Sequence, residues 1–366
     1  MIARLLKKNA VCPRHVVHVV QHLKPGGIET LVLELLSRTR ADRVSVISLE
    51  GRAAETIAKW PRLSRASEHL YFLNKEPGMR PQLALELARM LRTMGCDVVH
   101  THHVGPLLYG GIAARLSGCR LVHTEHDAWH LEDKRRRSLQ SLLVKVVRPT
   151  VVADALFVAQ AYRAALQRDP AKVVLNGIDC RHFHPGDKRS ARAELGLPQL
   201  GTLIGCAARL EKVKGVDQMI SALPFLPDYF GLAVAGDGSQ GHSLRQLARA
   251  LGVESRVSFL GRVDDMRTFY QALDLFCLPS RKEGMPLSPL EAQACGVPAV
   301  AFDVGGTSEA ICPETGFLVE AGNVNGLAEA LEAAVRQPAG VSPRNFVLRD
   351  GNLDQTAEAY NALYAA

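Results

Sequence analysis

Aromatic residues are scarce in this chain of 366 residues, since only 5% are Phe, Trp or Tyr. Proteins that hold single-stranded nucleic acid usually combine basic grooves with aromatic side chains on which bases stack. No stretch here interleaves basic with aromatic residues, so we expect no nucleic-acid partner. Long apolar runs are also missing, because none reaches the ~18 residues typical of a membrane-spanning helix. The basic start runs into CPRHVVHVV, which predicts a strand and no secretory signal, so we expect a cytoplasmic protein.

Paired cysteines are another missing feature. None of the eight cysteines belongs to a CxxC pair, and no cluster of Cys and His has the spacing of a zinc site. Scattered cysteines beside glycine and apolar residues are typical of buried, reduced thiols. We therefore expect neither a disulfide framework nor a metal site.

Complete phosphate-binding signatures are missing as well. Gly26 and Gly27 follow the first predicted strand without a full GxGxxG, so a dinucleotide site is poorly supported. The pair fits either a plain tight turn or a close approach of the backbone to a ligand at a helix N-terminus. No DxD stands at a strand end, where it could hold a metal ion against a diphosphate.

What the chain has in excess is positive charge. Lys and Arg number 44 against 37 Asp and Glu, which gives a net charge of +7 with neutral histidine. That excess favours an anionic partner, and with nucleic acid disfavoured it leaves a phosphorylated substrate or an anionic lipid.

Short apolar, β-branched runs alternate along the chain with helical patterns. Such alternation predicts an α/β fold, with parallel sheets that helices cover on both faces. The predicted strands are residues 15–20, 43–49, 97–102, 120–126, 155–160, 172–177, 202–208, 230–236, 256–261, 273–280, 298–306 and 316–320.

A seam divides these strands into two series. Residues 176–190, NGIDCRHFHPGDKRS, are rich in Gly, Pro and charge and show no period, as expected of a linker. We predict a doubly wound domain at 1–180, a second at 181–345, and a helix at 346–366 that packs back on the first. Ligands of such sheets bind at the carboxyl ends of the strands, near the point where the strand order reverses.

The stretch SRKEGMPLSPLEAQACGVPAV, residues 280–300, holds two carboxylates around a turn. Glu283 follows a buried strand, and Ser288, Pro289 and Glu291 have the spacing of the N-cap, N1 and N3 positions of a helix. The amides between the carboxylates then suit an anion or a hydroxyl-rich ligand. Each carboxylate also has a simpler interpretation, Glu291 as a helix cap and Glu283 as a solvated loop charge.

This stretch resembles the E-x7-E motif of retaining GT-B glycosyltransferases, the large glycosyltransferase family 4 (group 1). Further motifs match in the family's order over nearly the whole chain, and those of the second half are the more specific. They are PGGIETLVLELL (25–36), HTEHD (123–127), NGID (176–179), RLEKVKG (209–215), AGDG (235–238), GVPAVAFDVGG (296–306) and TGFLVE (315–320). The resemblance implies the GT-B fold, in which two Rossmann-like domains face each other across a cleft.

The resemblance also implies roles for particular residues. Arg209 and Lys214 are implied to bind the donor's diphosphate, which suits a guanidinium and an ammonium. Glu283 is implied to hold the sugar's hydroxyls and His126 to contact the transferring sugar, so both are candidate catalytic residues. The remaining substrate-binding candidates are Gly26, Gly27, Gly284, Met285, Pro286, Leu287 and Glu291.

Several other histidines lie near His126 in the first half. His100, His102 and His103 end the preceding strand, and either they line the acceptor side or they serve the structure. Alternation along strand 120–126 puts its other imidazole and acidic side chains on the face opposite His126, which argues against shared metal ligation.

For the reaction, the resemblance implies retaining transfer of a hexose from a nucleoside diphosphate sugar to an acceptor hydroxyl. It implies no cofactor and no metal, because the Arg209–Lys214 pair takes the metal's electrostatic role. The acceptor is expected to be a saccharide or a lipid-linked one, in bacterial surface polysaccharide or lipopolysaccharide assembly. Two other functions stay open: a nucleotide-sugar 2-epimerase and a non-catalytic GT-B scaffold subunit.

Residues 133–149, DKRRRSLQSLLVKVVRP, form a basic amphipathic pattern. Their cationic side chains alternate with leucines and with Val146. A helix of this kind either docks on an anionic membrane, here the inner membrane face where a lipid-linked acceptor would wait, or is an ordinary solvated face.

Overall fold

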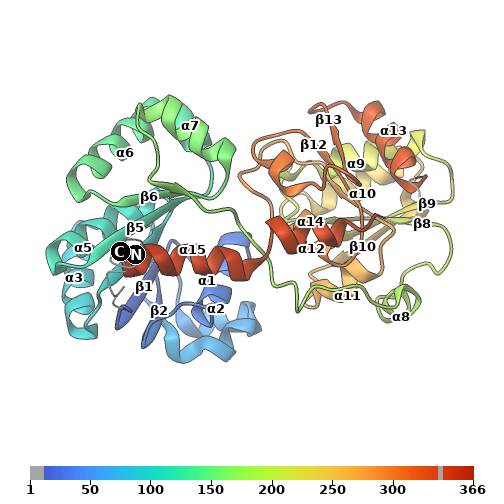
Figure 1. Ribbon diagram of the computed structural model, residues 1–366. Helices are drawn as coiled ribbons and strands as arrows, with labels where there is room; N and C mark the ends of the chain where they lie inside the picture. The colour runs from blue at the N-terminus through green and yellow to red at the C-terminus, as the bar shows by residue number, and fades with distance from the viewer. Residues whose placement is uncertain (1–11, 337–340) are drawn as a thin grey trace, which may run out of the picture. The chain divides into compact units, whose positions relative to one another are not determined.

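The computed structural model describes residues 12–336 and 341–366, and the chain divides into two compact units (Figure 1). The first unit holds the described residues up to Leu175 together with Asp354–Ala366, and the second holds Asn176–Leu353. The boundaries expected after residues 180 and 345 fall near these but not on them.

Local contacts explain both differences. The backbone and side-chain amides of Asn176 donate to the sulfur and carbonyl oxygen of Met285, at 3.3 and 3.4 Å, which ties the start of the linker to the second unit. The Arg344 guanidinium donates to the carbonyls of Cys180, Phe183 and Ala294, so the helix that carries it also stays in the second unit.

The first unit is built on a seven-stranded parallel sheet in the order β3-β2-β1-β4-β5-β6-β7. Its strands are β1 (His15–Val20), β2 (Arg43–Ser48), β3 (Leu70–Phe72), β4 (Val98–His102), β5 (Arg120–Glu125), β6 (Thr150–Ala153) and β7 (Lys172–Val173).

The second unit is built on a six-stranded parallel sheet in the order β10-β9-β8-β11-β12-β13. Its strands are β8 (Thr202–Ala207), β9 (Phe230–Ala235), β10 (Val257–Gly261), β11 (Leu275–Leu278), β12 (Ala299–Phe302) and β13 (Phe317–Val319).

Helices connect the strands in both units. Those of the first unit are α1 (Gly27–Leu36), α2 (Ala53–Lys59), η1 (Pro61–His69), α3 (Gln82–Met94), α4 (Val104–Pro106), η2 (Leu107–Gly111), α5 (Ile112–Ser117), η3 (Trp129–Glu132), α6 (Lys134–Val147), α7 (Leu156–Leu166) and α15 (Leu353–Ala365). Those of the second unit are α8 (Lys188–Glu194), η4 (Lys212–Lys214), α9 (Val216–Ala222), η5 (Leu223–Phe225), α10 (Gly241–Ala250), η6 (Glu254–Arg256), α11 (Met266–Gln271), α12 (Ser288–Ala294), η7 (Thr307–Ala310), α13 (Val324–Val335) and α14 (Pro343–Asp350).

The apolar runs form strands because parallel strands buried on both faces need apolar side chains on both sides. All six residues of β1 and all five of β4 are buried, and so are all four of β11. One predicted strand is wrong, because residues 155–160 begin helix α7 and the strand before it is β6. A short apolar run does not by itself distinguish a strand from a buried helix.

The strand order reverses once in each sheet, between β1 and β4 in the first and between β8 and β11 in the second. Connections leave these neighbouring strands toward opposite sides, which opens a crevice at their carboxyl ends where ligands of doubly wound sheets bind. The predicted site residues therefore have to be sought in the loops after these strands.

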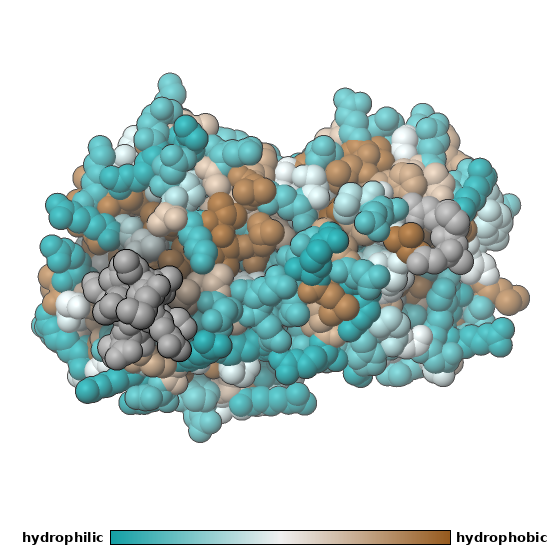
Figure 2. Space-filling view, viewed as in Figure 1, coloured by the Kyte–Doolittle hydropathy of each residue, from teal (hydrophilic) through white to brown (hydrophobic). Residues whose placement is uncertain are grey.

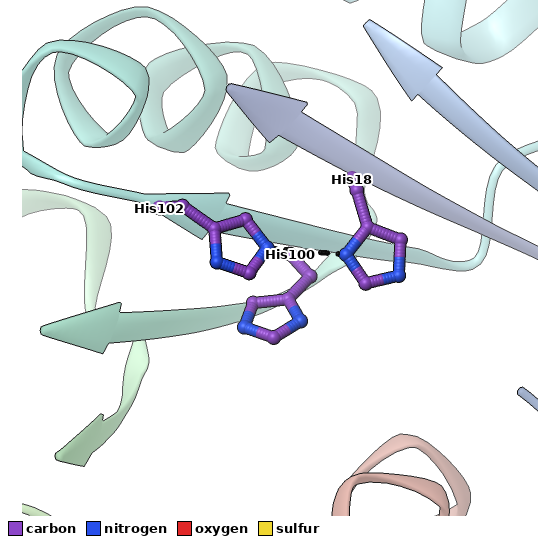
Figure 3. A group of neighbouring side chains, drawn as sticks. All are labelled: His18, His100 and His102. Carbon is purple, nitrogen blue, oxygen red and sulfur yellow. Dashed lines mark hydrogen bonds between the residues drawn. The ribbon is translucent and has the colours of Figure 1, made fainter. Parts of the chain in front are cut away.

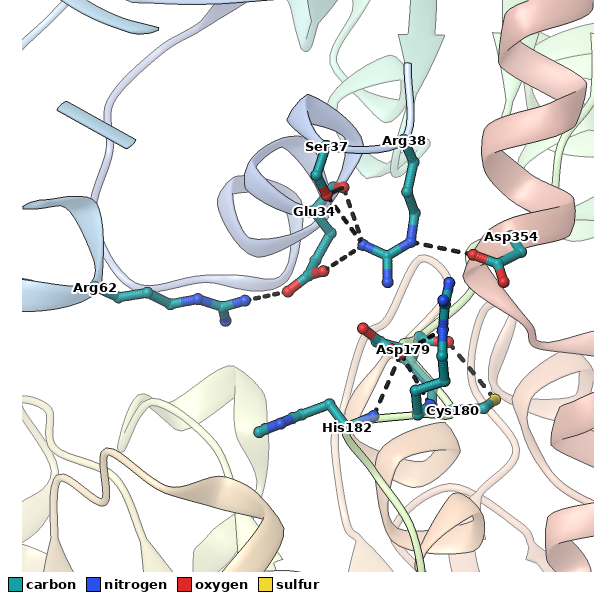
Figure 4. A network of polar contacts seen from close by, with 10 residues as sticks. Glu34, Ser37, Arg38, Arg62, Asp179, Cys180, His182 and Asp354 are labelled. Carbon is teal, nitrogen blue, oxygen red and sulfur yellow. Dashed lines mark hydrogen bonds and ion pairs between the residues drawn. The ribbon is translucent and has the colours of Figure 1, made fainter. Parts of the chain in front are cut away.

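Helix α15 joins the first unit although 178 residues of the second unit precede it. The Tyr364 hydroxyl lies 2.7 Å from His100 Nδ1, and the Tyr360 hydroxyl 3.1 Å from Thr124 Oγ1. At its start, Arg38 lies between Glu34 and Asp354 and bonds both carboxylates, at 2.8 and 3.2 Å (Figure 4). Helix α15 thus covers one face of the first sheet. Within the described residues, no helix has the length and apolar character needed to cross a membrane.

Candidate active site

The loops after β8 and β11 meet at the switch point of the second sheet. Lys214, at the end of η4, donates from Nζ to Glu283 Oε1 at 2.6 Å. The Ser280 hydroxyl donates to the same oxygen at 2.7 Å. Glu283 is therefore a buried carboxylate with a fixed position, and the interpretation as a solvated loop charge does not describe it.

The second oxygen of Glu283, Oε2, forms no hydrogen bond with any described residue. The backbone N–H groups of Gly284, Met285 and Leu287, which follow it, also find no hydrogen-bond partner in the described part of the chain. A carboxylate oxygen and several amides left open side by side can accept and donate hydrogen bonds to a polyhydroxylated anion. Pro286 lies between these residues and is buried.

Glycine at 305 is what allows the Glu283 loop to lie where it does. A Cβ on Gly305 would stand 1.8 Å from the Glu283 carbonyl oxygen, and its φ of +59° also disfavours other residues. The Gly306 N–H donates to the Gly284 carbonyl at 2.9 Å. The end of the motif GVPAVAFDVGG therefore packs against the loop that carries Glu283, here called the carboxylate loop, and holds its backbone in place.

Arg209 follows β8 and is exposed, and its guanidinium makes no hydrogen bond or ion pair within the described residues. The loop that carries it is held by its neighbours, since the Glu211 carboxylate accepts from the backbone N–H and the hydroxyl of Ser239, at 3.1 and 2.6 Å. A Cβ on Gly236 would stand 2.0 Å from the Ala208 carbonyl oxygen, so the glycine after β9 permits this close approach. The guanidinium is thus free to meet an anion.

Glu291 does not cap its helix. Helix α12 begins at Ser288 and its N-cap position is Leu287, so the predicted N-cap at Ser288 is wrong by one residue. The Glu291 carboxylate instead accepts a 2.6 Å hydrogen bond from the Tyr270 hydroxyl on α11. Burial and the charge of Glu291 hold the pKa of Tyr270 well above its ordinary value, so the phenol stays a donor.

In the first unit, Gly26 is the N-cap residue of α1 and Gly27 is its first residue. A Cβ on Gly26 would stand 2.4 Å from Glu29 Oε2, so glycine leaves room for that carboxylate to fold back over the helix start. The other oxygen of Glu29 lies 3.1 Å from His22 Nδ1. Because a carboxylate already lies at the N-terminus of α1, this loop suits hydroxyl groups better than phosphates.

His126 follows β5 and belongs to a chain of buried polar side chains. Its Nδ1 lies 3.0 Å from Asp154 Oδ2, its Nε2 lies 2.9 Å from His102 Nδ1, and His102 Nε2 lies 3.1 Å from His18 Nδ1. A carboxylate can only accept, so one consistent arrangement of protons places them on Nδ1 of all three rings. This histidine relay, Asp154–His126–His102–His18, occupies both ring nitrogens of His126.

Three histidines of this region, His18, His100 and His102, bring ring nitrogens within 4.8 Å of one another (Figure 3). Burial lowers the pKa of His18 to about 3 and that of His100 and His102 well below its ordinary value, so all three are neutral. Both nitrogens of His100 lie 2.7 Å from hydroxyls, those of Tyr364 and Thr124. Hydrogen bonds thus account for this trio, apart from His18 Nε2, which is buried without a partner.

The surroundings of His100 and His102, which belong to β4, differ from those of His103, which follows it. His100 and His102 are buried beneath α15 and do not line an acceptor site. The His103 side chain remains 35% exposed, and its Nδ1 lies 3.8 Å from Asp127 Oδ2. Asp127 Oδ1 lies 3.1 Å from His130 Nδ1. Burial opposes the charge of His130, but the bond to Asp127 and the charge of Glu125 outweigh it and raise the pKa of His130.

Helix α6 has the amphipathic character that the sequence predicts. Its inner face is buried and includes Leu143, Val144 and Val147. Its outer face exposes Leu142 and Val146 at 58% and 57%, among exposed cationic side chains. Figure 2 shows mostly hydrophilic residues with apolar ones between them over the region of α6 and α7.

Sequence reasoning missed several members of these networks. Ser280, Tyr270 and Asp154 hold predicted site residues in place, yet each lies in a different sequence context. Only Ser280, three positions before Glu283, stood close enough for its spacing to suggest a contact.

Two family models match this chain, one for each half. Glycosyltransferase Family 4 matches residues 25–182, and Glycosyl transferases group 1 matches residues 187–347. Together they span both units and all of the loops described above.

Curated relatives with similar sequences include two mannosyltransferases. The lipopolysaccharide core biosynthesis mannosyltransferase LpsB of Rhizobium meliloti is 35% identical over 58% of this chain and 65% of its own length. The GDP-mannose-dependent monoacylated alpha-(1-6)-phosphatidylinositol monomannoside mannosyltransferase of Corynebacterium glutamicum is 28% identical over 86% of both chains. The match with LpsB thus spans a little under two thirds of that relative.

Solved structures with a similar fold include HepE from Anabaena in complex with UDP and glucose. It has a TM-score of 0.84 and 22% identity, with coverage of 96% of this chain and 99% of its own. The lipopolysaccharide outer core galactosyltransferase WaaB has a TM-score of 0.71 and 18% identity, with coverage of 96% and 99%. With a matching model for each half and this fold, the chain belongs to the GT-B glycosyltransferases of family 4, group 1.

Proposed function

We propose that this protein transfers a hexosyl group from a nucleoside diphosphate sugar to an acceptor hydroxyl, with retention of configuration at the sugar's C1. The second unit holds the donor and the first unit holds the acceptor. We further propose a setting in the assembly of lipopolysaccharide or another surface glycolipid, because LpsB and the corynebacterial relative carry such acceptors in their names. These names also make GDP-mannose the first donor to test.

The observation that carries this proposal is the arrangement at the switch point of the second sheet. Glu283 offers one open oxygen for sugar hydroxyls, and the neighbouring open amides and the cations Arg209 and Lys214 offer positive potential for a diphosphate. Carboxylate and cation lie together, joined by the 2.6 Å bond between Lys214 and Glu283.

In the proposed reaction, the bond between C1 and the β-phosphate oxygen breaks and the bond between C1 and the acceptor oxygen forms on the same face. The acceptor's hydroxyl proton goes to the leaving phosphate oxygen. Arg209, Lys214 and the open amides stabilise the negative charge that builds up on this leaving group. Glu283, held by Lys214 and Ser280, is proposed to orient the sugar without bonding to C1, and His126 to contact the transferring sugar through its ring edge, because both of its nitrogens are already hydrogen-bonded. These cations supply the charge that a metal ion provides in other enzymes, so we propose that no metal is needed.

A binding panel followed by product analysis tests this function. Calorimetry with GDP-, UDP- and ADP-sugars identifies the donor, and the anomeric configuration of the product, read by NMR, tests retention. Lys214→Ala is expected to weaken donor binding about tenfold, while Lys212→Ala, on the exposed side of the same turn, leaves it unchanged. If no nucleotide sugar binds, or if Lys214→Ala binds like the wild type, the proposed site is wrong.

We also propose that the protein is cytoplasmic and docks on anionic membranes through α6. The exposed Leu142 and Val146 would enter the headgroup region while neighbouring cations such as Arg135 and Lys145 meet anionic lipids. Flotation with vesicles of neutral lipid alone, and with vesicles that also contain anionic lipid, tests the proposal. Binding only to the anionic vesicles, lost in Leu142→Ser/Val146→Ser, is expected. No binding to either vesicle would refute it.

A further inference from the structure

His103 lies at the carboxyl end of β4, in a backbone conformation that residues other than glycine rarely adopt. Its φ is +72° and its ψ 165°, a combination favoured by glycine alone. Arg148 and Gln167 also have positive φ, but both have ordinary left-handed helical values and end helices. The conformation of His103 is therefore a strained one that the surrounding structure maintains.

The fold itself has little need of an imidazole at this position. His103 is the N-cap residue of α4, but its side chain makes no capping hydrogen bond, and its carbonyl accepts from the Leu107 N–H at 3.0 Å as any residue could. Its ring lies edge-on to that of His126, with centroids 5.6 Å apart, and about a third of the side chain is exposed. Glycine would serve the backbone without strain.

The surroundings of the ring indicate what it can do. Its Nδ1 faces the Asp127 carboxylate at 3.8 Å, which favours a proton on that nitrogen and leaves a lone pair on Nε2. Nε2 makes no hydrogen bond within the described residues. Burial lowers the pKa of His103, while the charges of Asp127 and Glu29 oppose this effect.

We propose that His103 accepts a hydrogen bond from the acceptor hydroxyl through Nε2, and that its strained backbone aims the ring at that hydroxyl. This inference rests on the proposed function and adds a specific acceptor-contacting residue to it. The contact positions the bound acceptor before the reaction. As the new bond forms, the O–H group turns from Nε2 to the leaving phosphate oxygen, which takes the proton as described above.

Two substitutions at one position separate strain from chemistry. His103→Ala and His103→Gly both remove the imidazole, but only glycine relieves the backbone. At an unstrained position alanine is the more stable of the two, because glycine has more freedom in the unfolded chain. We expect the opposite order here, with a higher Tm for His103→Gly. Both variants should lose about a hundredfold in kcat/KM for the acceptor, while donor affinity stays at the wild-type value.

Gln167→Gly is the matched control, since it relieves a positive φ on an exposed helix end and should leave transfer unchanged. Wild-type transfer by His103→Gly would overturn the contact, and a higher Tm for His103→Ala than for His103→Gly would overturn the strain. Failure of the wild type to bind any nucleotide sugar would instead contradict the proposed function. The two melting temperatures need no substrate, so they report on the strain in either case.

Discussion

At the carboxyl end of β11, the two oxygens of Glu283 have different surroundings. Oε1 accepts from Lys214 and Ser280, which fixes the carboxylate, and Oε2 has no partner among the described residues. One oxygen of Glu283 therefore fixes the position of the carboxylate, and the other is available to bind a ligand. An amide in its place keeps the size but loses the charge that attracts Lys214.

We accordingly predict that Glu283→Gln lowers kcat about a hundredfold or more, because the fixed charge beside the reacting sugar is lost. Steady-state rates with saturating donor measure this. Glu254→Gln is the control, since the Glu254 pair with Arg249 is exposed and such pairs contribute little to stability. Equal rates for wild type and Glu283→Gln would exclude Glu283 from the site.

Gly305 allows a second prediction at this scale. Gly305→Ala would force a Cβ to within 1.8 Å of the Glu283 carbonyl oxygen, so the carboxylate loop must move and transfer should fall at least as far as in Glu283→Gln. Gly252→Ala is the matched control, because Gly252 has a similar φ of +70° but open space around it. It should cost about 1 kcal/mol of stability without loss of transfer. An active Gly305→Ala enzyme would show that the loop tolerates displacement.

At the scale of elements, strands β1, β4 and β5 join through the buried histidine relay. His18, His100 and His102 stay neutral in the fold, whereas in the unfolded chain each binds a proton below pH ~6.5. The unfolded state therefore gains protons that the folded state does not, and stability falls as the pH falls. His130 has the opposite sign: its raised pKa contributes stability that is fully present below pH ~6.5 and lost as the pH rises through its folded pKa.

Burial also lowers the pKa of His15 and of His103, so these groups together outweigh His130. We therefore predict net destabilisation of the first unit below pH ~6.5, with a slope approaching roughly 3–4 kcal/mol per pH unit from His18, His100 and His102 alone. Urea unfolding at several pH values measures it. Both tryptophans, Trp60 and Trp129, lie in the first unit, so their fluorescence follows that unit alone. His18→Gln should reduce the slope by about 1.4 kcal/mol per pH unit, the contribution of one titrating group, and the exposed control His242→Gln should leave it unchanged. A pH-independent stability would refute the assignment.

Helices and strands were predictable from the sequence where their structure depends on residues within the element and not on contacts with distant parts of the chain. Apolar runs predict buried strands such as β1 and β8, and the alternation of these runs with helical patterns predicts the fold class. The run at 155–160 misled because α7 begins with consecutive apolar residues although it does not bury all of them: Leu156 and Phe157 are exposed, and Val158 is buried. Glu291 misled because its partner, Tyr270, comes from another element, so local spacing indicated a cap instead.

The same limit applies to the histidines of β4. Their roles depend on α15, which comes from the far end of the sequence and places Tyr364 against His100. No local spacing distinguishes His102, which is buried at the end of β4, from His103, which follows the strand and is half-buried. Such a distinction requires the positions of residues that are distant in sequence.

For the whole molecule, the two units carry different parts of the proposed site, so a donor nucleotide should act on one of them. At a hundred times its Kd, a nucleotide that binds only the folded second unit stabilises it by about 2.7 kcal/mol. Calorimetric scans with GDP or UDP should therefore show an upward shift of one transition, while the tryptophan-detected transition stays in place. A shift of the tryptophan signal alone would assign the nucleotide to the first unit.

The position of α15 in the chain has a consequence for biosynthesis. Its tyrosines cover the first sheet, yet the ribosome adds them only after it has made the entire second unit. At about 5–20 residues per second, the nascent first unit waits roughly 10–35 s with its buried imidazoles uncovered. The first unit is therefore translated first but completes its core last. Until α15 is made, either chaperones protect this unit or it misfolds too slowly for the delay to matter.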